Sequence, residues 1–191
     1  MKGTRDLPES IGATHERATA AGFRLTCELE VGRLLAVLSE AVPSGRILEI
    51  GTGVGGGLAW LIHGLGERLD VGVEPVELVH DIQQAACSAE WPPWVRFESR
   101  DGAEVVSGLG QFDLIFPDAP GGKIFKLSRV VAALRPGGFL AIDDMEATRH
   151  EDERLRTALI IAQQRLVGNP ELICTELDFA SGVIVAVKRR V

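Results

Sequence analysis

Short apolar runs with the pattern of strands alternate along this chain with longer segments whose apolar residues recur at helical spacing. Such alternation predicts β-α units around a parallel sheet. The expected strands cover residues 46–50, 69–73, 94–97, 112–116, 139–142, 172–179 and 183–187. The expected helices cover residues 31–42 and 58–65, a segment opened by Pro75, and residues 127–134 and 155–166.

The end of the chain departs from this alternation. Only Ala180-Ser181-Gly182 separates the last two expected strands, and three residues cannot form the crossover that parallel strands need. These strands must therefore pair as an antiparallel hairpin. The whole pattern predicts an α/β, Rossmann-like, doubly wound fold with a mostly parallel seven-stranded sheet and a C-terminal antiparallel hairpin.

The composition is that of one globular domain. The chain has 191 residues, of which 46% are hydrophobic and 25% charged, and no repeat or low-complexity linker divides it. We therefore expect residues 1–191 to form a single domain. Its N-terminal helical segment, residues 1–42, is expected to serve as a substrate lid or as a contact in a homodimer, and both roles stay open.

Charge and hydropathy limit the partners and the location. The net charge of −7 disfavours a nucleic acid held by its phosphates, so a small-molecule partner is expected. No apolar run reaches the roughly 18 residues that span a bilayer, and the first residues lack a secretory signal. The three cysteines lack the spacing of a disulfide framework or zinc site. These features predict a cytoplasmic protein with no membrane contact.

A glycine-rich loop follows the first expected strand. Residues 49–57 are Glu-Ile-Gly-Thr-Gly-Val-Gly-Gly-Gly, and a helix follows directly. Glycines let the backbone approach a ligand closely, and the helix N-terminus offers unpaired N–H groups to an anion. Gly51, Gly53 and Gly56 also fit the dinucleotide pattern G-x-G-x-x-G, so NAD stays open as the ligand.

Two further acids follow the next expected strands. Glu74 ends the second strand about twenty residues after the loop, where a carboxylate is placed to bind both ribose hydroxyls of a nucleotide. Asp101 follows the third strand, within reach of an adenine amino group, although Asp101-Gly102 is also a common turn.

Four motifs in a fixed order carry a family resemblance. They are Ile-Leu-Glu-Ile-Gly-Thr-Gly at residues 47–53, Val-Glu-Pro at 73–75, Phe-Asp-Leu-Ile-Phe-Pro-Asp-Ala at 112–119 and Leu-Arg-Pro-Gly-Gly-Phe-Leu-Ala-Ile-Asp-Asp at 134–144. Their order and spacing resemble the class I S-adenosylmethionine (SAM) dependent O-methyltransferases of the catechol O-methyltransferase type. The resemblance covers about residues 25–190, and the terminal hairpin is similar to the reversed seventh strand of that fold.

The resemblance implies a SAM site at the ends of the first strands. The glycine loop would hold the methionine part of SAM, Glu74 would bind the ribose, and Asp101 with Gly102 would lie by the adenine. Asp118 would border the same site. The loop residues implied in binding are Glu49, Gly51, Thr52, Gly53 and Gly55.

Three acids follow two other strands. Asp118 comes after the strand at 112–116, and Asp143 with Asp144 after the strand at 139–142. Because ligands of open α/β sheets bind beyond the carboxyl ends of the strands, these carboxylates should converge beside the methyl donor. Carboxylates this close repel one another unless a cation lies among them, and their oxygen atoms are ligands that suit Mg²⁺ or Ca²⁺. The sequence therefore predicts an optional metal site at these three residues.

The identity of the general base is open. Related enzymes use two aspartates and an asparagine as metal ligands, with a lysine shortly after the first aspartate as base. Here Asp144 stands at the asparagine position, Gly121 stands at the lysine position, and Lys123 lies two residues later. The resemblance nominates Asp118 and Lys123 as catalytic, with a solvated Lys123 as the alternative. His150 is another candidate base, although a surface histidine is the simpler interpretation.

We therefore expect a SAM-dependent methyltransferase that acts on a hydroxyl oxygen of a small molecule, with a divalent metal as an optional aid. Two alternatives stay open. One is an NAD(P)-dependent oxidoreductase, which the terminal hairpin and the strand-end acids disfavour. The other is a SAM-binding module that has lost its chemistry.

Overall fold

A computed structural model describes residues 7–24, 26–78, 80–98, 104 and 106–190. Asp101 and Gly102, which were predicted to contact the adenine, lie outside the described residues. The strands are β1 Gly45–Ile50, β2 Val71–Val76, β3 Phe112–Pro117, β4 Leu134–Ile142, β5 Leu172–Leu177 and β6 Val183–Lys188. The helices are α1 Glu9–Ala20, α2 Leu29–Glu40, α3 Gly56–Leu65, α4 His80–Cys87, α6 Pro120–Lys123, α7 Leu127–Ala133, the short η1 Ala147–Arg149 and α8 Glu153–Val167.

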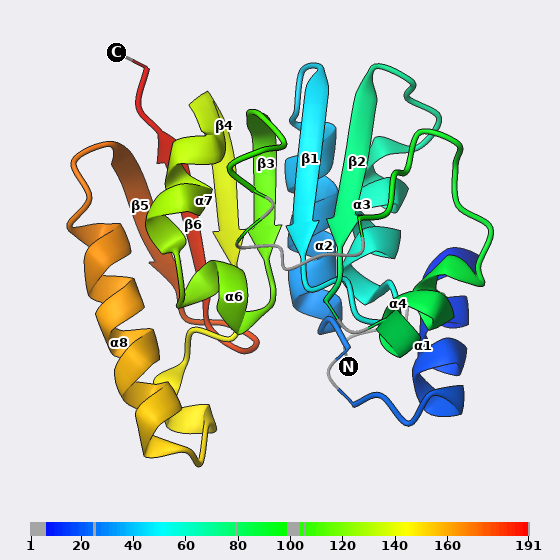
Figure 1. Cartoon of the computed structure of the whole chain (residues 1–191), viewed down its shortest axis with the longest axis horizontal. Coiled ribbons are helices and arrows are strands. Elements are labelled where there is room, and N and C mark those ends of the chain that lie inside the picture. The colour runs from blue at the N-terminus through cyan, green and yellow to red at the C-terminus, as the bar shows by residue number, and fades with distance from the viewer. Residues whose placement is uncertain (1–6, 25, 79, 99–103, 105, 191) are drawn as a thin grey trace, which may run out of the picture.

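These strands form a six-stranded sheet in the order β2-β1-β3-β4-β6-β5 (Figure 1). β1 pairs in parallel with β2 and β3, β3 pairs in parallel with β4, and β6 runs antiparallel to β4 and β5. The carboxyl ends of β1 to β4 therefore meet at one edge of the sheet, the lower edge in Figure 1. The predicted α/β fold and its C-terminal hairpin are confirmed.

The prediction of a seventh strand is wrong. Within the described part of the chain, residues 94–97 contribute only isolated bridges to the free edge of β2. Arg96 and Glu98 donate their N–H groups to carbonyls of β2, the second of them to Pro75 O at 3.0 Å. A continuous parallel ladder needs an N–H from β2 between these two bonds, and Pro75 has none to donate. Pro75 thus restricts pairing along the free edge of β2 to isolated bridges.

Two predicted boundaries also differ from the structure. Pro75 does not open a helix, because it lies within β2 opposite Glu49 of β1, and α4 begins only at His80. The strand expected at residues 139–142 begins earlier, because β4 already starts at Leu134 and includes the Arg-Pro-Gly-Gly stretch at 135–138. In this stretch the pairing register against β3 shifts and Gly137 has a φ of 83°, so the strand is irregular here.

The sheet is buried on both faces. Successive side chains of a strand point to opposite sides, so Leu48 and Ile50 pack with α7 and α8 while Ile47 packs with α2 and α3. Figure 1 shows α2 and α3 behind the sheet and α7 and α8 in front of it. Strands with apolar residues on both faces, such as Ile47, Leu48 and Ile50 of β1, are what this double burial requires.

α2 and α3 cross at close range through glycine. A Cβ atom on Gly64 of α3 would lie 2.2 Å from both Ala36 O and Ser39 Oγ of α2. A Cβ atom on Gly32 of α2 would lie 2.1 Å from Nε1 of Trp60. This contact fixes the position of α3, which begins directly after the glycine loop at the carboxyl edge of the sheet.

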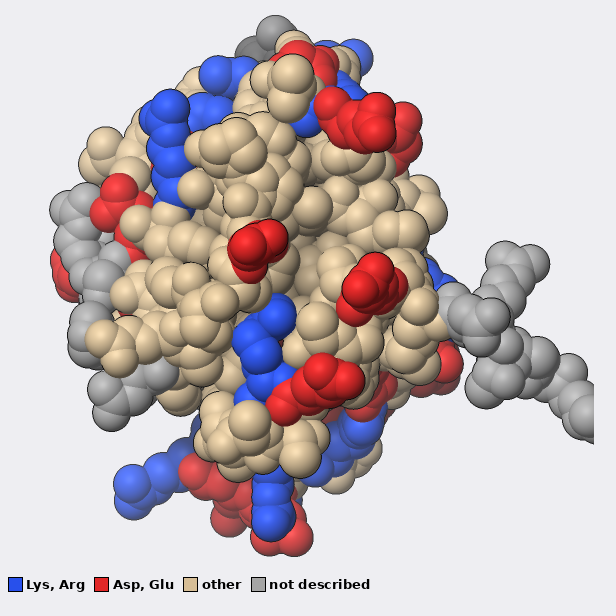
Figure 2. Space-filling view, turned by 90° about the vertical axis from the view of Figure 1, so that its right-hand side faces the viewer, with Lys and Arg blue, Asp and Glu red and all other residues tan. Residues whose placement is uncertain are grey.

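Among the described helices, none has the length and apolarity needed to cross a membrane. Figure 2 shows the face of the molecule over α1 and α4, where acidic and basic side chains are interspersed. The described residues on this face do not gather positive charge of the kind that binds a phosphate backbone.

The α2–α3 contact is tested by a pair of glycine substitutions. Gly64→Ala should lower the free energy of unfolding by about 1–3 kcal/mol, since the added methyl group must push against a backbone carbonyl. Gly12→Ala in α1 meets no atom within 4 Å and should be neutral or stabilise by up to about 1 kcal/mol. Urea unfolding of both variants measures the difference, and equal stabilities would contradict the close contact.

Candidate active site

A cavity of about 440 Å³ opens at the carboxyl edge of the sheet. Its volume suits a small organic ligand. The loops after β1, β2, β3 and β4 all contribute to its wall, together with the segment between α1 and α2. The lining residues that matter most to the chemistry are Gly51, Gly53, Glu77, Asp118, Asp143 and Asp144.

The glycine loop forms one wall of this cavity. Gly51 and Gly53 have φ angles of 92° and 57°, which favour glycine. A Cβ atom on Gly51 would lie 2.9 Å from Ala119 N, and one on Gly53 would lie 2.9 Å from the ring of Phe23. The loop is therefore held tightly from both sides, and its backbone faces the cavity as the sequence predicts. Thr52 and Gly55 are not among the residues that line the cavity.

Glu49 is a buried acid beneath this loop. It lies in β1, it is 1% exposed, and its Oε2 atom has no hydrogen-bond partner among the described residues. Oγ1 of Thr52 is likewise buried and unpartnered. The pKa of Glu49 is raised to about 8, mainly by burial, while interaction with the Thr52 side chain lowers it and the nearby charges of Asp118 and Glu77 add to the rise. Buried polar atoms without partners next to a glycine loop suit a polar ligand such as the methionine part of SAM.

The acid that ends β2 is Glu77, not Glu74. Glu74 was expected to end the second strand, but β2 continues to Val76, and ribose binding by Glu74 stays a prediction. Glu74 instead accepts hydrogen bonds from Arg46, with 2.8 Å between its Oε1 and Arg46 Nε, and is not among the cavity-lining residues. Glu77 lines the cavity, and its Oε2 accepts a hydrogen bond from Gly53 N at 2.9 Å. Continuing the strand pattern through Pro75 would have found Glu77 from the sequence.

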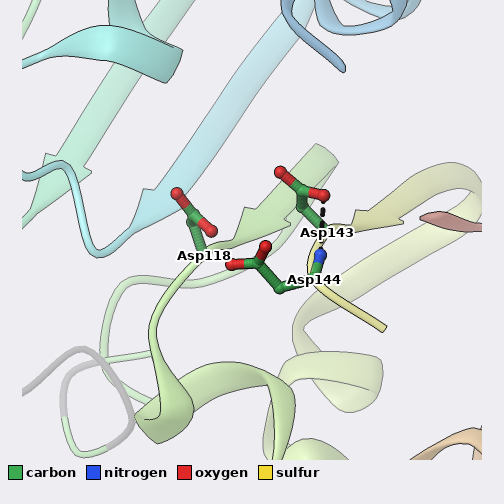
Figure 3. Close-up of side chains that lie close together, drawn as sticks. All are labelled: Asp118, Asp143 and Asp144. Atoms are coloured by element: carbon green, nitrogen blue, oxygen red, sulfur yellow. Dashed lines mark hydrogen bonds between the residues drawn. The ribbon is translucent and has the colours of Figure 1, made fainter. Parts of the chain in front are cut away.

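Asp118, Asp143 and Asp144 converge at another part of the cavity wall. One carboxylate oxygen of each lies within 4.8 Å of the others, which confirms that the three acids meet. Figure 3 shows the carboxylates of Asp118 and Asp144 facing one another across the ends of two strands. Asp143 Oδ1 accepts hydrogen bonds from Asp144 N at 2.6 Å and from Ser181 Oγ. The role of Ser181, in the hairpin turn, carried no signal in the sequence.

The electrostatics of this wall disfavour full ionisation. Burial raises the pKa of Asp118 to about 7, Lys123 lowers it, and the charges of Asp143 and Asp144 raise it. Burial also raises the pKa of Asp143, with Asp144 adding to the effect and the hydrogen bond from Ser181 opposing it. Like charges held together in a partly desolvated site account for both shifts.

Lys123 lies inside the acid cluster. It ends the short helix α6, whose turn brings it back over Asp118, and it is 5% exposed. Its Nζ atom lies 3.5 Å from Asp118 Oδ1, 3.3 Å from Asp144 Oδ2 and 3.1 Å from Asp143 O. The alternative of a solvated lysine is therefore wrong.

Residues before β1 close the cavity on its outer side. Phe23, Arg24, Thr26 and Glu28, between α1 and α2, all line it. Glu28 forms an ion pair of 2.7 Å with Arg149 of η1, so two distant segments meet at this wall. The candidate base His150 contacts the backbone O of Asp144 at 3.3 Å but does not line the cavity.

The three carboxylates are compatible with an optional divalent cation as a donor set, because they offer oxygen ligands at suitable spacing. However, the ammonium group of Lys123 already lies against two of them, and a metal ion sharing these oxygens would be repelled by it.

The parallel sheet with its reversed last strand, the glycine loop after β1 and the acid after β2 define the class I SAM-dependent methyltransferase fold. Comparison with known proteins supports this assignment. No protein-family model matches the chain. A Mycobacterium tuberculosis protein named O-methyltransferase is 29% identical over 189 residues, which cover 93% of this chain and 84% of that protein.

Solved structures agree in fold. The O-methyltransferase TomG of Streptomyces achromogenes, solved in complex with SAM, superposes with a TM-score of 0.83 at 18% identity over 98% of this chain and 92% of that one. An O-methyltransferase of Bacillus cereus in complex with SAH gives a TM-score of 0.80 at 19% identity over 97% and 93%. The chain is thus a homologue of proteins named O-methyltransferase and has the fold of SAM-dependent O-methyltransferases, as its motifs predict.

The buried state of Glu49 predicts how stability depends on pH. Because its pKa is about 8 in the folded protein and the ordinary value is 4.5, the folded state keeps a proton that the unfolded state has lost between these values. Stability should therefore fall by a few kcal/mol as the pH rises from about 5 to 8. Glu49→Gln should remove much of this fall.

Urea unfolding from pH 5 to 9, without SAM, measures the effect, and exposed Glu67→Gln serves as the matched control. The control should follow the wild type. If the Glu49→Gln protein loses stability in parallel with the wild type, Glu49 is not the buried acid responsible.

Proposed function

We propose that this protein is a SAM-dependent methyltransferase that transfers a methyl group to a hydroxyl oxygen of a small molecule. The observation that carries the proposal is one cavity lined both by the glycine loop and by a cluster of carboxylates. Relatives named O-methyltransferase and neighbours solved with SAM or SAH support it. Neither an oxidoreductase nor an inactive module gains comparable support.

The proposed donor site uses the loop and the acid after β2. Gly51 and Gly53 would approach the methionine part of SAM through their backbone. Binding by Glu49 and Thr52, which do not line the cavity, stays a prediction. Glu77 would bind the ribose hydroxyls, because it is the acid at the carboxyl end of β2. Binding by Gly55, Asp101 and Gly102 stays a prediction.

Bound SAM would supply an electrophilic methyl group on a sulfonium. The chain's own contribution is to align the acceptor oxygen behind that methyl group and to exclude water, which accounts for much of the acceleration in reactions of this kind. Asp118 lines the cavity next to the glycine-loop side, so it would accept the hydrogen bond of the acceptor hydroxyl. The carbon–sulfur bond breaks, a carbon–oxygen bond forms, and the hydroxyl proton passes to the Asp118 carboxylate, giving SAH and a methyl ether. No step passes through a metal.

The remaining proposals concern partners and organisation. The cavity wall includes Phe23, Arg24, Thr26 and Glu28, which supports a lid role for the N-terminal residues over a dimer contact. The acceptor is proposed to be a small molecule because the cavity is small. A single domain over residues 1–191 and a cytoplasmic location stay predictions.

The corrected ribose acid is tested by calorimetry with SAM. Glu77→Gln should weaken SAM binding by about tenfold to a hundredfold, since it removes a charged hydrogen-bond acceptor worth roughly 1.5–3 kcal/mol. Glu74→Gln, three residues away but turned toward Arg46, should change the affinity by less than about threefold. The opposite ranking would restore Glu74 as the ribose acid.

Activity is tested with SAM and a panel of hydroxylated small molecules, by mass spectrometry of SAH and methylated product. Asp118→Asn should lower turnover by about a hundredfold or more, with a smaller effect on SAM affinity. Binding of NAD without binding of SAM would overturn the proposal in favour of an oxidoreductase. SAM binding with no turnover on any acceptor would favour the inactive module.

A further inference from the structure

The buried ammonium group of Lys123 has an unusually complete set of partners. An ammonium group carries three N–H donors. Three acceptors surround Lys123 Nζ within 3.5 Å, namely Asp118 Oδ1, Asp144 Oδ2 and the main-chain O of Asp143. Because every donor direction has an acceptor and the side chain is only 5% exposed, the group is held as a cation.

This arrangement does not suit a proton acceptor. A lysine that takes a proton from an acceptor molecule must be neutral and must turn its lone pair toward the cavity. Here Lys123 does not line the cavity, and its nitrogen faces two carboxylates and a carbonyl. Its carboxylate partners Asp118 and Asp144 both line the cavity, whereas Lys123 does not.

The same oxygens are the ones a divalent cation would use. Mg²⁺ or Ca²⁺ binds carboxylate oxygens at about 2.0–2.6 Å, so the ligand atoms of Asp118, Asp143 and Asp144 are suitably spaced. Yet Oδ1 of Asp118 and Oδ2 of Asp144 already pair with Lys123 Nζ. Oδ1 of Asp143 is already engaged by Ser181 and by the N–H of Asp144. The cluster therefore has an internal cation at the point where a metal would bind.

We propose that Lys123 is a built-in cation that takes the place of a divalent metal, holding Asp118 and Asp144 in position beside the acceptor so that the site works without a metal ion. The inference rests on the proposed function in one respect, namely that the methyl acceptor binds beside Asp118 and Asp144. Lys123 is a positioning residue in this scheme, since it acts through the two carboxylates rather than by touching the reacting atoms.

The proposal is tested by titrating the protein with Mn²⁺ alone. Binding is measured as the decrease in the electron paramagnetic resonance signal of free Mn²⁺. The wild type should take up no stoichiometric Mn²⁺ below about 1 mM, because the ammonium group repels it. Lys123→Met keeps an apolar stem of similar length without the charge and should bind one Mn²⁺ per chain about tenfold or more tightly. Adding Asp144→Asn to Lys123→Met should abolish that binding.

Lys126→Met is the matched control, since Lys126 lies three residues later and pairs with Glu104 outside the cluster. It should behave as the wild type in Mn²⁺ binding. Circular dichroism checks that each variant is folded. The measurement needs neither SAM nor an acceptor, so its outcome is independent of whether methyl transfer is the right reaction.

Two results would overturn the proposal. The first is a wild-type protein that binds one Mn²⁺ per chain and loses that binding with Asp144→Asn, because the lysine would then coexist with a metal. The second is a folded Lys123→Met protein that binds no Mn²⁺, because the lysine would then not be what excludes it. If Lys123→Met fails to fold, the wild-type titration is the test, and stoichiometric Mn²⁺ binding by the wild type would overturn the proposal.

Discussion

Burial of several carboxyl groups at one edge of the sheet is the constraint on which the rest of this structure depends. Glu49, Asp118 and Asp143 all have raised pKa values, and burial is the largest cause in each case. Such groups lower the stability of a fold unless they gain partners. Ser181 and Lys123 supply partners to two of them, whereas Oε2 of Glu49 has none among the described residues. Strained electrostatics of this kind are typical of a working site.

The apolar layers on both faces of the sheet stabilise the fold and so hold these buried acids in place. Both faces of the sheet are buried, so the edge that carries the acids is fixed by the strands themselves. The close crossing of α2 and α3 fixes the start of α3, and the contacts of Gly51 and Gly53 fix the loop before it. The donor-binding wall is therefore set before any ligand arrives, which reduces the ordering that binding must bring about.

The sequence was sufficient for the features that depend on local pattern. The alternation of strands and helices along the chain, the hairpin that turns at Ser181, the glycine loop and the meeting of Asp118 with Asp143 and Asp144 all follow from apolar runs and from the rule that parallel strands end at one edge. These features need no knowledge of which side chains touch.

What could not be predicted depends on exact lengths and on tertiary contacts. Pro75 was expected to open a helix, and its place within β2 shifts the strand-end acid from Glu74 to Glu77. The same proline reduces the expected seventh strand to bridges. The position of Lys123 depends on one turn of helix after Asp118, which spacing alone does not reveal.

The wall that Phe23, Arg24, Thr26 and Glu28 contribute comes from a part of the chain that precedes the sheet altogether. Its only described ion pair to the far side of the cavity joins Glu28 to Arg149, and neither residue belongs to a strand. Selectivity for the acceptor can therefore diverge during evolution through changes in this leading segment, while the machinery for the methyl donor is inherited intact.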